Sequence, residues 1–331
     1  MRLGHALILC AATVGWMPIS SQAKTTCKYC KEVQKAKAKV CHYCRSSVDY
    51  VNHPFPTPIA VSGAIDESPC WGPGGKITYI NSKTGRDVVT MSAVGATPVR
   101  HQRGQDSHAD AMPFWGPNNK IVFNGGAVSQ NLYVMDADGS NRKRITEDDT
   151  ADEVAPSMNA QGTIVFRSDV GQRGESGYNL FTVDINGGNM TKITKDGTFN
   201  NNPCWSPDGK KIAFNRYVDD NQDIYVMDAD GSNIKRLTTN PKADYDPSWG
   251  PDGRIAFVSE RDAEQFDRDK ELGEIYIMNT DGTGQRRLTW NRWRDRKPSL
   301  GEGGKILIES SPTYGAGKSQ LNSIFMITAK K

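Results

Sequence analysis

Two sets of residues in this chain of 331 residues have types and spacings that could support chemistry. Four cysteines near the N-terminus form a C-x2-C-x10-C-x2-C pattern, made of Cys27, Cys30, Cys41 and Cys44. Two such pairs can converge on one tetrahedral Zn²⁺, because each short knuckle directs two thiolates the same way. The second set is a polar residue three positions before a recurring proline: Asp66, Asp110, Glu153, Asn200, Asp244 and Asp295.

The recurring acids have two interpretations. If they surround one mouth of a ring, they form a negative funnel that binds a cation or a basic segment of a partner. Alternatively, each carboxylate accepts hydrogen bonds from nearby backbone N–H groups and holds the start of its own structural unit. Both can hold together, so we treat the six positions as candidate residues for binding a ligand or partner at a channel mouth.

The element that must position these acids is a repeat. The stretch from Asn200 to Thr238 contains short apolar runs separated by Ser-Pro-Asp-Gly and Asp-Ala-Asp-Gly turns, as expected for four strands. Its proline recurs at Pro69, Pro113, Pro156, Pro203, Pro247 and Pro298. A period of about 44 residues is typical of a propeller blade. The sequence therefore predicts an all-β fold: a six-bladed β-propeller with four antiparallel strands in each blade.

The two ends of the repeat array predict how the ring closes. The sixth repeat ends after a third strand, at residues 321–328, and has no fourth strand after it. Residues 57–62 resemble a fourth strand and precede the first repeat. We expect this N-terminal strand to complete the sixth blade, because a closed ring leaves no exposed sheet edge.

Loops of different length should lie on one face of that ring. Since successive strands in a blade are antiparallel, the second-to-third-strand loops share a face with the links between blades. The longer of these loops are predicted at residues 167–178, 216–222, 259–273 and 309–322. Variable loops on a repeated scaffold are where recognition is expected.

The repeats resemble a known family. The matching segments are PCWSPDGKKIAF (203–214), YVMDADGSNIKRLT (225–238), PSWGPDGRIAF (247–257) and LYVMDADGSNRKRIT (132–146). They are similar to the WD40-like (PD40) repeats of TolB-type propellers. The resemblance implies a periplasmic partner protein in an envelope complex. TolB-type proteins carry an α/β domain ahead of the propeller, whereas this chain has the cysteine segment, which resembles a short zinc ribbon.

The N-terminus has the pattern of an export signal. Arg2 precedes a mainly apolar stretch, and Ser21 and Ala23 are small residues suited to signal cleavage. We therefore expect a signal peptide (1–23), a cysteine segment (24–45), a linker (46–56) and a propeller (57–331), in a periplasmic or secreted protein. An oxidising compartment would favour disulfides over zinc at the four cysteines, so both outcomes stay open, as do free thiols.

The overall charge and the missing motifs bear on function. The formal net charge of +3 gives no reason to expect nucleic acid or anionic lipid as a partner, and outside the signal no run is apolar enough to span a membrane. The sequence has neither a G-x-S-x-G elbow nor an H-E-x-x-H motif. The first hypothesis is therefore a protein-binding module without enzymatic activity. The alternative is a lyase or hydrolase that acts on acidic saccharides at the channel mouth.

Overall fold

A computed structural model describes residues 56–60, 64–83, 85–103, 109–170, 177–195, 197–262, 273–290, 294–311 and 322–329. The chain divides into two compact units, Met1–Val48 and Asp49–Lys331, and every described residue belongs to the second unit. The predicted signal peptide, the four-cysteine segment and residues 46–55 of the linker lie outside the described residues. Their predictions, including zinc at Cys27, Cys30, Cys41 and Cys44, stay predictions.

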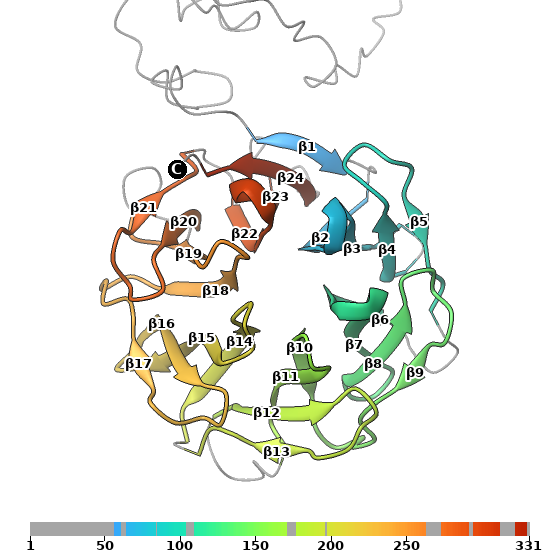
Figure 1. Cartoon of the computed structure of the whole chain (residues 1–331), viewed down its shortest axis with the longest axis horizontal. Coiled ribbons are helices and arrows are strands. Elements are labelled where there is room, and N and C mark those ends of the chain that lie inside the picture. The colour runs from blue at the N-terminus through green and yellow to red at the C-terminus, as the bar shows by residue number, and fades with distance from the viewer. Residues whose placement is uncertain are drawn as a thin grey trace, which may run out of the picture. The chain divides into compact units, whose positions relative to one another are not determined.

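The described residues form six four-stranded antiparallel sheets around a central channel (Figure 1), which confirms the predicted fold. Blades 1 to 3 consist of β2 (Asp66–Trp71), β3 (Ile77–Asn81), β4 (Asp87–Met91), β5 (Val99–Arg100); β6 (Ala109–Trp115), β7 (Lys120–Gly126), β8 (Asn131–Asp136), β9 (Lys143–Arg144); β10 (Glu153–Met158), β11 (Thr163–Ser168), β12 (Asn179–Asp184) and β13 (Thr191–Lys192). Blades 4 to 6 consist of β14 (Phe199–Trp205), β15 (Lys211–Val218), β16 (Asn221–Asp228), β17 (Lys235–Arg236); β18 (Asp244–Trp249), β19 (Ile255–Ser259), β20 (Glu274–Met278), β21 (Arg286–Arg287); β22 (Arg294–Leu300), β23 (Lys305–Ser311), β24 (Ser323–Thr328) and β1 (Thr57–Ala60). Short 3₁₀ turns follow the first strand in three blades: η3 (Pro73–Gly75), η4 (Pro117–Asn119) and η6 (Glu302–Gly304).

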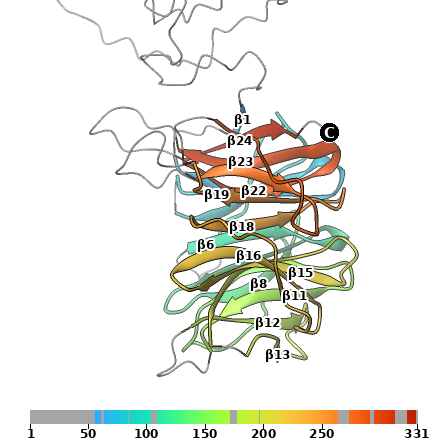
Figure 2. The same ribbon diagram turned by 90° about the vertical axis from the view of Figure 1, so that its left-hand side faces the viewer.

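The ring closes as the ends of the sequence predict. Strand β1 pairs antiparallel with β24, with Thr57 opposite Met326 and Ala60 opposite Ile324. The sixth blade is therefore built from both ends of the repeat array, and β1 lies outside β24 in Figure 1. Figure 2 shows the blades from the side. Residues 61 and 62 of the predicted strand lie outside the described residues.

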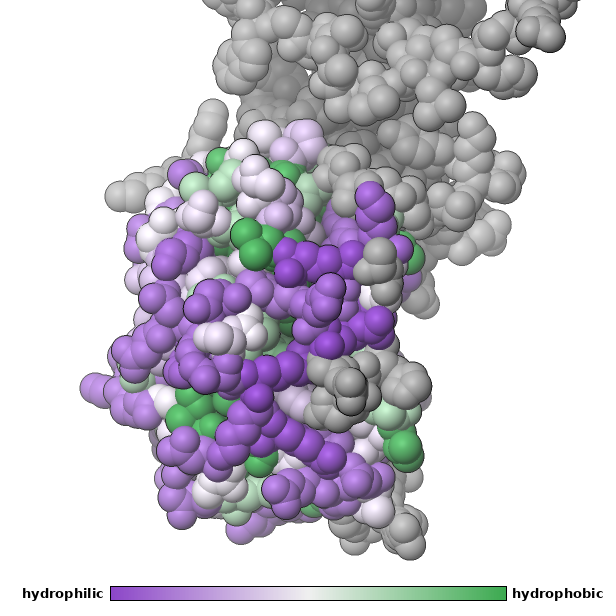
Figure 3. Space-filling model, turned by 90° about the vertical axis from the view of Figure 1, so that its right-hand side faces the viewer, coloured by the Kyte–Doolittle hydropathy of each residue, from purple (hydrophilic) through white to green (hydrophobic). Residues whose placement is uncertain are grey.

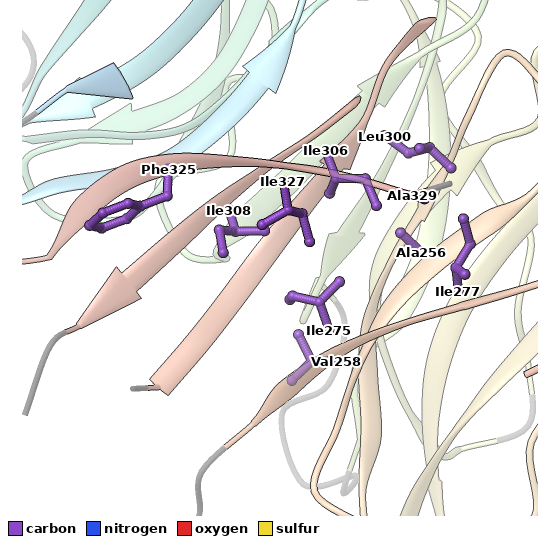
Figure 4. Packing of buried hydrophobic residues seen from close by; sticks show 10 residues of the cluster. All are labelled: Ala256, Val258, Ile275, Ile277, Leu300, Ile306, Ile308, Phe325, Ile327 and Ala329. Carbon is purple, nitrogen blue, oxygen red and sulfur yellow. The ribbon is translucent and has the colours of Figure 1, made fainter. Parts of the chain in front are cut away.

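The blades are held together by apolar contacts between neighbouring sheets. Figure 4 shows one such layer, where Val258 and Ile275 of blade 5 pack with Ile308 and Ile327 of blade 6. Turns also pack closely against indole rings. Gly301 lies so near the Trp71 ring that a Cβ atom on it would be only 2.7 Å from the ring, which is too close for a side chain. Each sheet thus buries both faces only because it has two neighbours. The rim seen in Figure 3 is mostly hydrophilic, with small separate apolar patches.

Each inner strand bulges immediately before its proline. The residue at that point has a positive φ, between 47° and 55°, in all six blades: Ser68, Met112, Ala155, Asn202, Asp246 and Lys297. Pairing between the first and second strands shifts register at the same place, for example between Glu67 and Cys70. Proline has no N–H to donate to the ladder, so the pairing is interrupted there. The bulge brings these six residues to the channel.

One predicted loop is wrong. Residues 216–222 do not form a variable loop, because β15 extends to Val218 and β16 begins at Asn221. Asp219 and Asp220 alone make the turn, with φ of 51° and 59°. A two-residue hairpin with positive φ at both positions matches the right-handed twist of its strands, and aspartate tolerates that conformation. No helix in the described part of the chain is long and apolar enough to span a membrane.

Candidate functional site

The six predicted site residues are buried in the ring. Asp66, Asp110, Glu153, Asn200, Asp244 and Asp295 lie at the start of the six inner strands, or one position into it, and all have 0% exposure. They therefore occupy equivalent places in the six blades, as the spacing predicts. In this structure none of them presents its charge to solvent, so their binding role at a channel mouth stays a prediction.

Two of the acids are paired with largely buried arginines, whose side chains are 15% and 18% exposed. Arg142 donates two hydrogen bonds to Asp110, at 2.8 and 3.0 Å. Arg261 donates two to Asp244, at 3.0 and 3.2 Å. The Arg142 guanidinium also lies over the Phe123 ring, 4.6 Å from its centre. Arg142 precedes the fourth strand of blade 2, whereas Arg261 follows the second strand of blade 5. Arginines from different parts of a blade can therefore pair with the acid position.

Two other acids of the set bond to neutral side chains, and the asparagine at this position bonds to an arginine. Asn81 donates to Asp66 at 2.6 Å, and Ser310 donates to Asp295. In blade 4 the position is Asn200, whose side-chain oxygen accepts from Arg216 Nε at 2.8 Å. These contacts favour the architectural interpretation, although the partners are mostly side chains rather than the backbone N–H groups expected from the sequence.

The buried carboxyl group of Glu153 is only partly satisfied by hydrogen bonds. Its Oε2 accepts a hydrogen bond from Thr146, in the last turn of blade 2, at 2.6 Å. Its Oε1 is buried with no hydrogen-bond partner among the described residues. Burial raises the pKa of Glu153 to about 7, and nearby Asp148 adds to this while the Thr146 hydrogen bond opposes it. A carboxyl group at the interface of blades 2 and 3 is thus protonated well above the usual pH range.

The channel contains a small cavity of about 130 Å³, lined by the bulged residues and the two residues that follow each of them. Three bulged residues from different blades meet across it. Asp246 accepts hydrogen bonds from Asn202, at 2.7 Å, and from Lys297, at 2.9 Å. Lys297 also reaches Asn202 of blade 4, at 3.3 Å. This triad joins blades 4, 5 and 6, whereas blades 2 and 3 contribute Met112 and Ala155, so the channel has a polar side and an apolar side.

Charged side chains continue from the channel towards the loop face in blades 6 and 1. Arg296 pairs with Glu309 at 2.6 Å, and Arg86 pairs with Glu67. Glu309 also accepts a hydrogen bond from the backbone N–H of Ser68 at 3.1 Å, which links blade 6 to blade 1. Burial raises the pKa of Glu67, with Glu309 adding to the rise and Arg86 opposing it. The mouth on this side therefore carries paired charges of both signs.

The recurring blade geometry agrees with comparisons against known proteins. The family model described as the TolB beta propeller domain matches residues 24–216, and the model of the tricorn protease N-terminal beta propeller domain matches residues 175–271. The first match covers more than half of the chain. This chain belongs to the TolB β-propeller family. No curated protein matches the sequence significantly.

Solved structures share this TolB-type fold at low identity. A structure described as putative TolB from Agrobacterium tumefaciens is 18% identical with a TM-score of 0.62, covering 83% of this chain and 97% of that one. TolB from Acinetobacter baumannii is 22% identical with a TM-score of 0.58, covering 73% of this chain and 58% of that one. An oligogalacturonate lyase from Vibrio parahaemolyticus is 14% identical with a TM-score of 0.54, covering 83% and 93%. This chain therefore spans little more than half of the Acinetobacter protein, and the likenesses show the fold alone.

Within this TolB-type ring, one cluster of side chains on the loop face is not predicted from the sequence. The Arg167 guanidinium lies 4.1 Å from the centre of the Tyr178 ring. Phe199 contacts Tyr178 edge-on, with ring centres 5.3 Å apart, and Tyr217 in the same way at 6.2 Å. Arg167 also donates to the side-chain oxygen of Asn201 at 3.2 Å. We call Arg167, Tyr178, Phe199, Asn201 and Tyr217 the Arg167 cluster.

The sequence carried a signal for the channel residues but a weak one for the Arg167 cluster. The residue before each blade proline varies from Ser to Lys while its surroundings repeat, and that contrast marks the channel position. Arg167, by contrast, is predicted at the start of a loop but lies within β11, opposite Leu180. Burial raises the pKa of the Cys70 thiol to about 11 and that of the Cys204 thiol to about 12. Among the described residues, no three His, Cys, Asp or Glu side chains are grouped to hold a metal ion.

Proposed function

We propose that this chain is an exported TolB-like propeller, periplasmic or secreted, that binds a protein partner on its loop face at the channel mouth. The observation that supports this most is the contrast between positions. The buried acid position is polar in all six blades, whereas the channel position differs in every blade and carries different chemistry on each side of the mouth. A surface that departs from its own repeat is suited to recognising one partner.

The channel geometry limits how that partner binds. Asn202, Asp246 and Lys297 meet in the channel, so a segment that enters the mouth would meet hydrogen-bonding groups there. The paired charges of blades 6 and 1 lie beside this site. Charged groups of both signs at an interface favour specificity and orientation over affinity alone. We therefore propose surface docking with a short insertion into the mouth.

The chemistry of the partner follows from the family and the charge balance. TolB-type relatives act as partners in envelope complexes, so we propose a protein of the cell envelope as the partner. The near-neutral net charge of +3 gives no reason to propose nucleic acid as the partner. We further propose that Cys27, Cys30, Cys41 and Cys44 hold one Zn²⁺ ahead of the propeller. Metal analysis of protein purified without chelator tests this, and two disulfides found by mass spectrometry with no zinc would overturn it.

Photocrosslinking in cells that produce the protein tests the binding face. Benzoylphenylalanine is placed at one of two exposed loop-face positions, Lys83 or Val128, or at one of two exposed positions on the opposite face, Val94 or Asp230. We expect the same protein to be captured from both loop-face positions and from neither control position. Equal capture from the control positions, or no capture from any of the four, would contradict the proposal.

A further inference from the structure

Arg167 differs from three other cations near the channel mouth. Arg86, Arg296 and Lys297 each have a carboxylate partner, Glu67, Glu309 and Asp246 respectively. Among the described residues, Arg167 has no carboxylate within 4 Å; it bonds to the neutral amide of Asn201 and stacks on Tyr178. Its Nε is buried and has no hydrogen-bond partner in the described part of the chain.

Two nearby carboxylates are held in other contacts. Asp152 accepts a hydrogen bond from the backbone N–H of Gln130 at 2.8 Å, and Asp169 accepts one from the backbone N–H of Asp152 at 2.7 Å. Both favour the charged form of Arg167 at a distance, but burial outweighs them and lowers its pKa. Arg167 therefore remains a partly desolvated cation whose charge no direct partner neutralises, which is the environment that binds an anion most strongly.

The cluster has a fixed geometry and an apolar side. Stacking on Tyr178 holds the plane of the guanidinium, and a planar fork of N–H donors matches a carboxylate. Asn201 lies next to Asn202, so the arginine is close to the channel. On the other side, Phe199 and Tyr217 continue the ring contacts outward to a side chain that is 38% exposed, Tyr217. A ligand that fits both sides has an anionic group beside an apolar or aromatic one.

We propose that the Arg167 cluster binds a carboxylate of the partner protein, with an adjacent apolar side chain packed on Phe199 and Tyr217. This rests on the proposed function, since it names the chemistry that the loop face recognises. It also reverses the polarity expected from the recurring acids: the five acids and Asn200 are buried, whereas Arg167 is a cation with no carboxylate partner among the described residues. An acidic saccharide is the competing ligand, and the experiment separates the two.

The test uses the full chain and a small probe, 3-phenylpropionate, which carries both required groups. Binding is followed by NMR of the arginine Nε–H signals, with the Arg167 signal assigned from its absence in R167Q. We expect the Arg167 signal to shift with a dissociation constant in the millimolar range that rises with NaCl. R167Q should weaken binding at least ~10-fold and Y217A about threefold, from the loss of a charged hydrogen-bond donor and of a ring contact. The charge-matched control on the opposite face, Lys235→Gln, should bind unchanged.

Three results would overturn the inference. One is equal binding of the neutral analogue 3-phenylpropionamide, the second is unchanged binding by folded R167Q, and the third is tighter binding of D-glucuronate than of 3-phenylpropionate. If R167Q does not fold, the effect of Y217A on binding of the probe decides, because Tyr217 is exposed. If the binding experiment with 3-phenylpropionate fails while crosslinking at Lys83 and Val128 is retained, only the carboxylate site is rejected. Loss of that crosslinking rejects the proposed function itself.

Discussion

Two regions of each inner strand lie only two residues apart and behave in opposite ways. At the first position, Asp110 and its five equivalents are buried, and side-chain groups hold them within the ring. At the second, Met112 and its five equivalents face the channel and share only a positive φ. The difference indicates that polarity repeated in every blade builds the scaffold. We propose that the departures from the repeat, together with Arg167, form the recognition surface.

The largest effect should come from removing the strand that closes the scaffold. Deleting residues 45–62 removes β1 and leaves β24 as an open edge in a ring that depends on closure. We expect the thermal midpoint of the whole propeller to fall steeply, with loss of cooperative unfolding. Deleting residues 24–44 serves as the control and should leave the midpoint unchanged. Equal midpoints for the two deletions would show that the closing strand is dispensable.

The next effect concerns one recurring acid. D110A leaves the Arg142 guanidinium buried without its carboxylate, which is expected to cost about 3–5 kcal/mol of the free energy of unfolding. Urea unfolding followed by tryptophan fluorescence measures this. A loss below about 1 kcal/mol would mean that the recurring acid is not part of the scaffold, since a surface ion pair contributes no more than that.

The scaffold was predictable from the sequence because its residues repeat. Six prolines at one spacing gave the number of blades, and the missing fourth strand of the last blade gave the closure. The site was less predictable, because the position of Asp110 showed its recurrence but not its burial, which depends on how neighbouring blades pack. The Arg167 cluster combines residues from two blades, and no spacing within one repeat reports such a contact. The hairpin at Asp219 was mistaken for a loop because two acids in a row resemble a solvent-exposed connection.

A smaller effect should appear as a pH dependence at Glu153. Its pKa rises from 4.5 to about 7 on folding, so the folded state binds more protons than the unfolded state between these values. Stability contributed by the protonated carboxyl is therefore fully present below about pH 4.5 and is lost as pH rises through about 7. E153Q keeps the shape without the charge and should be more stable than the unmodified chain at pH 8, by on the order of 2 kcal/mol.

Thermal unfolding of both proteins from pH 5 to pH 8 measures this dependence. The unmodified chain should lose stability across that range relative to E153Q, and the two curves should converge near pH 5. Parallel curves would show that Glu153 does not change its protonation on folding in this range.

The smallest effect on stability should come from the channel side of the comparison. K297M removes the cation that bonds Asp246 and Asn202, but Asp246 keeps its hydrogen bond from Asn202. Because Lys297 is partly exposed, we expect a loss of only about 1 kcal/mol in urea unfolding. A loss as large as that of D110A would remove the distinction between scaffold and channel positions.

The most direct test of the central claim is one binding assay on two folded variants. D110N/D244N alters two recurring acids, and R167Q alters the recognition surface. The titration of 3-phenylpropionate is repeated for both at a temperature where each is folded by circular dichroism. We predict that D110N/D244N binds the probe with an unchanged dissociation constant despite its lower stability, whereas R167Q binds at least ~10-fold more weakly. Weakened binding by D110N/D244N with intact binding by R167Q would contradict the account, because the recurring acids would then be the binding site.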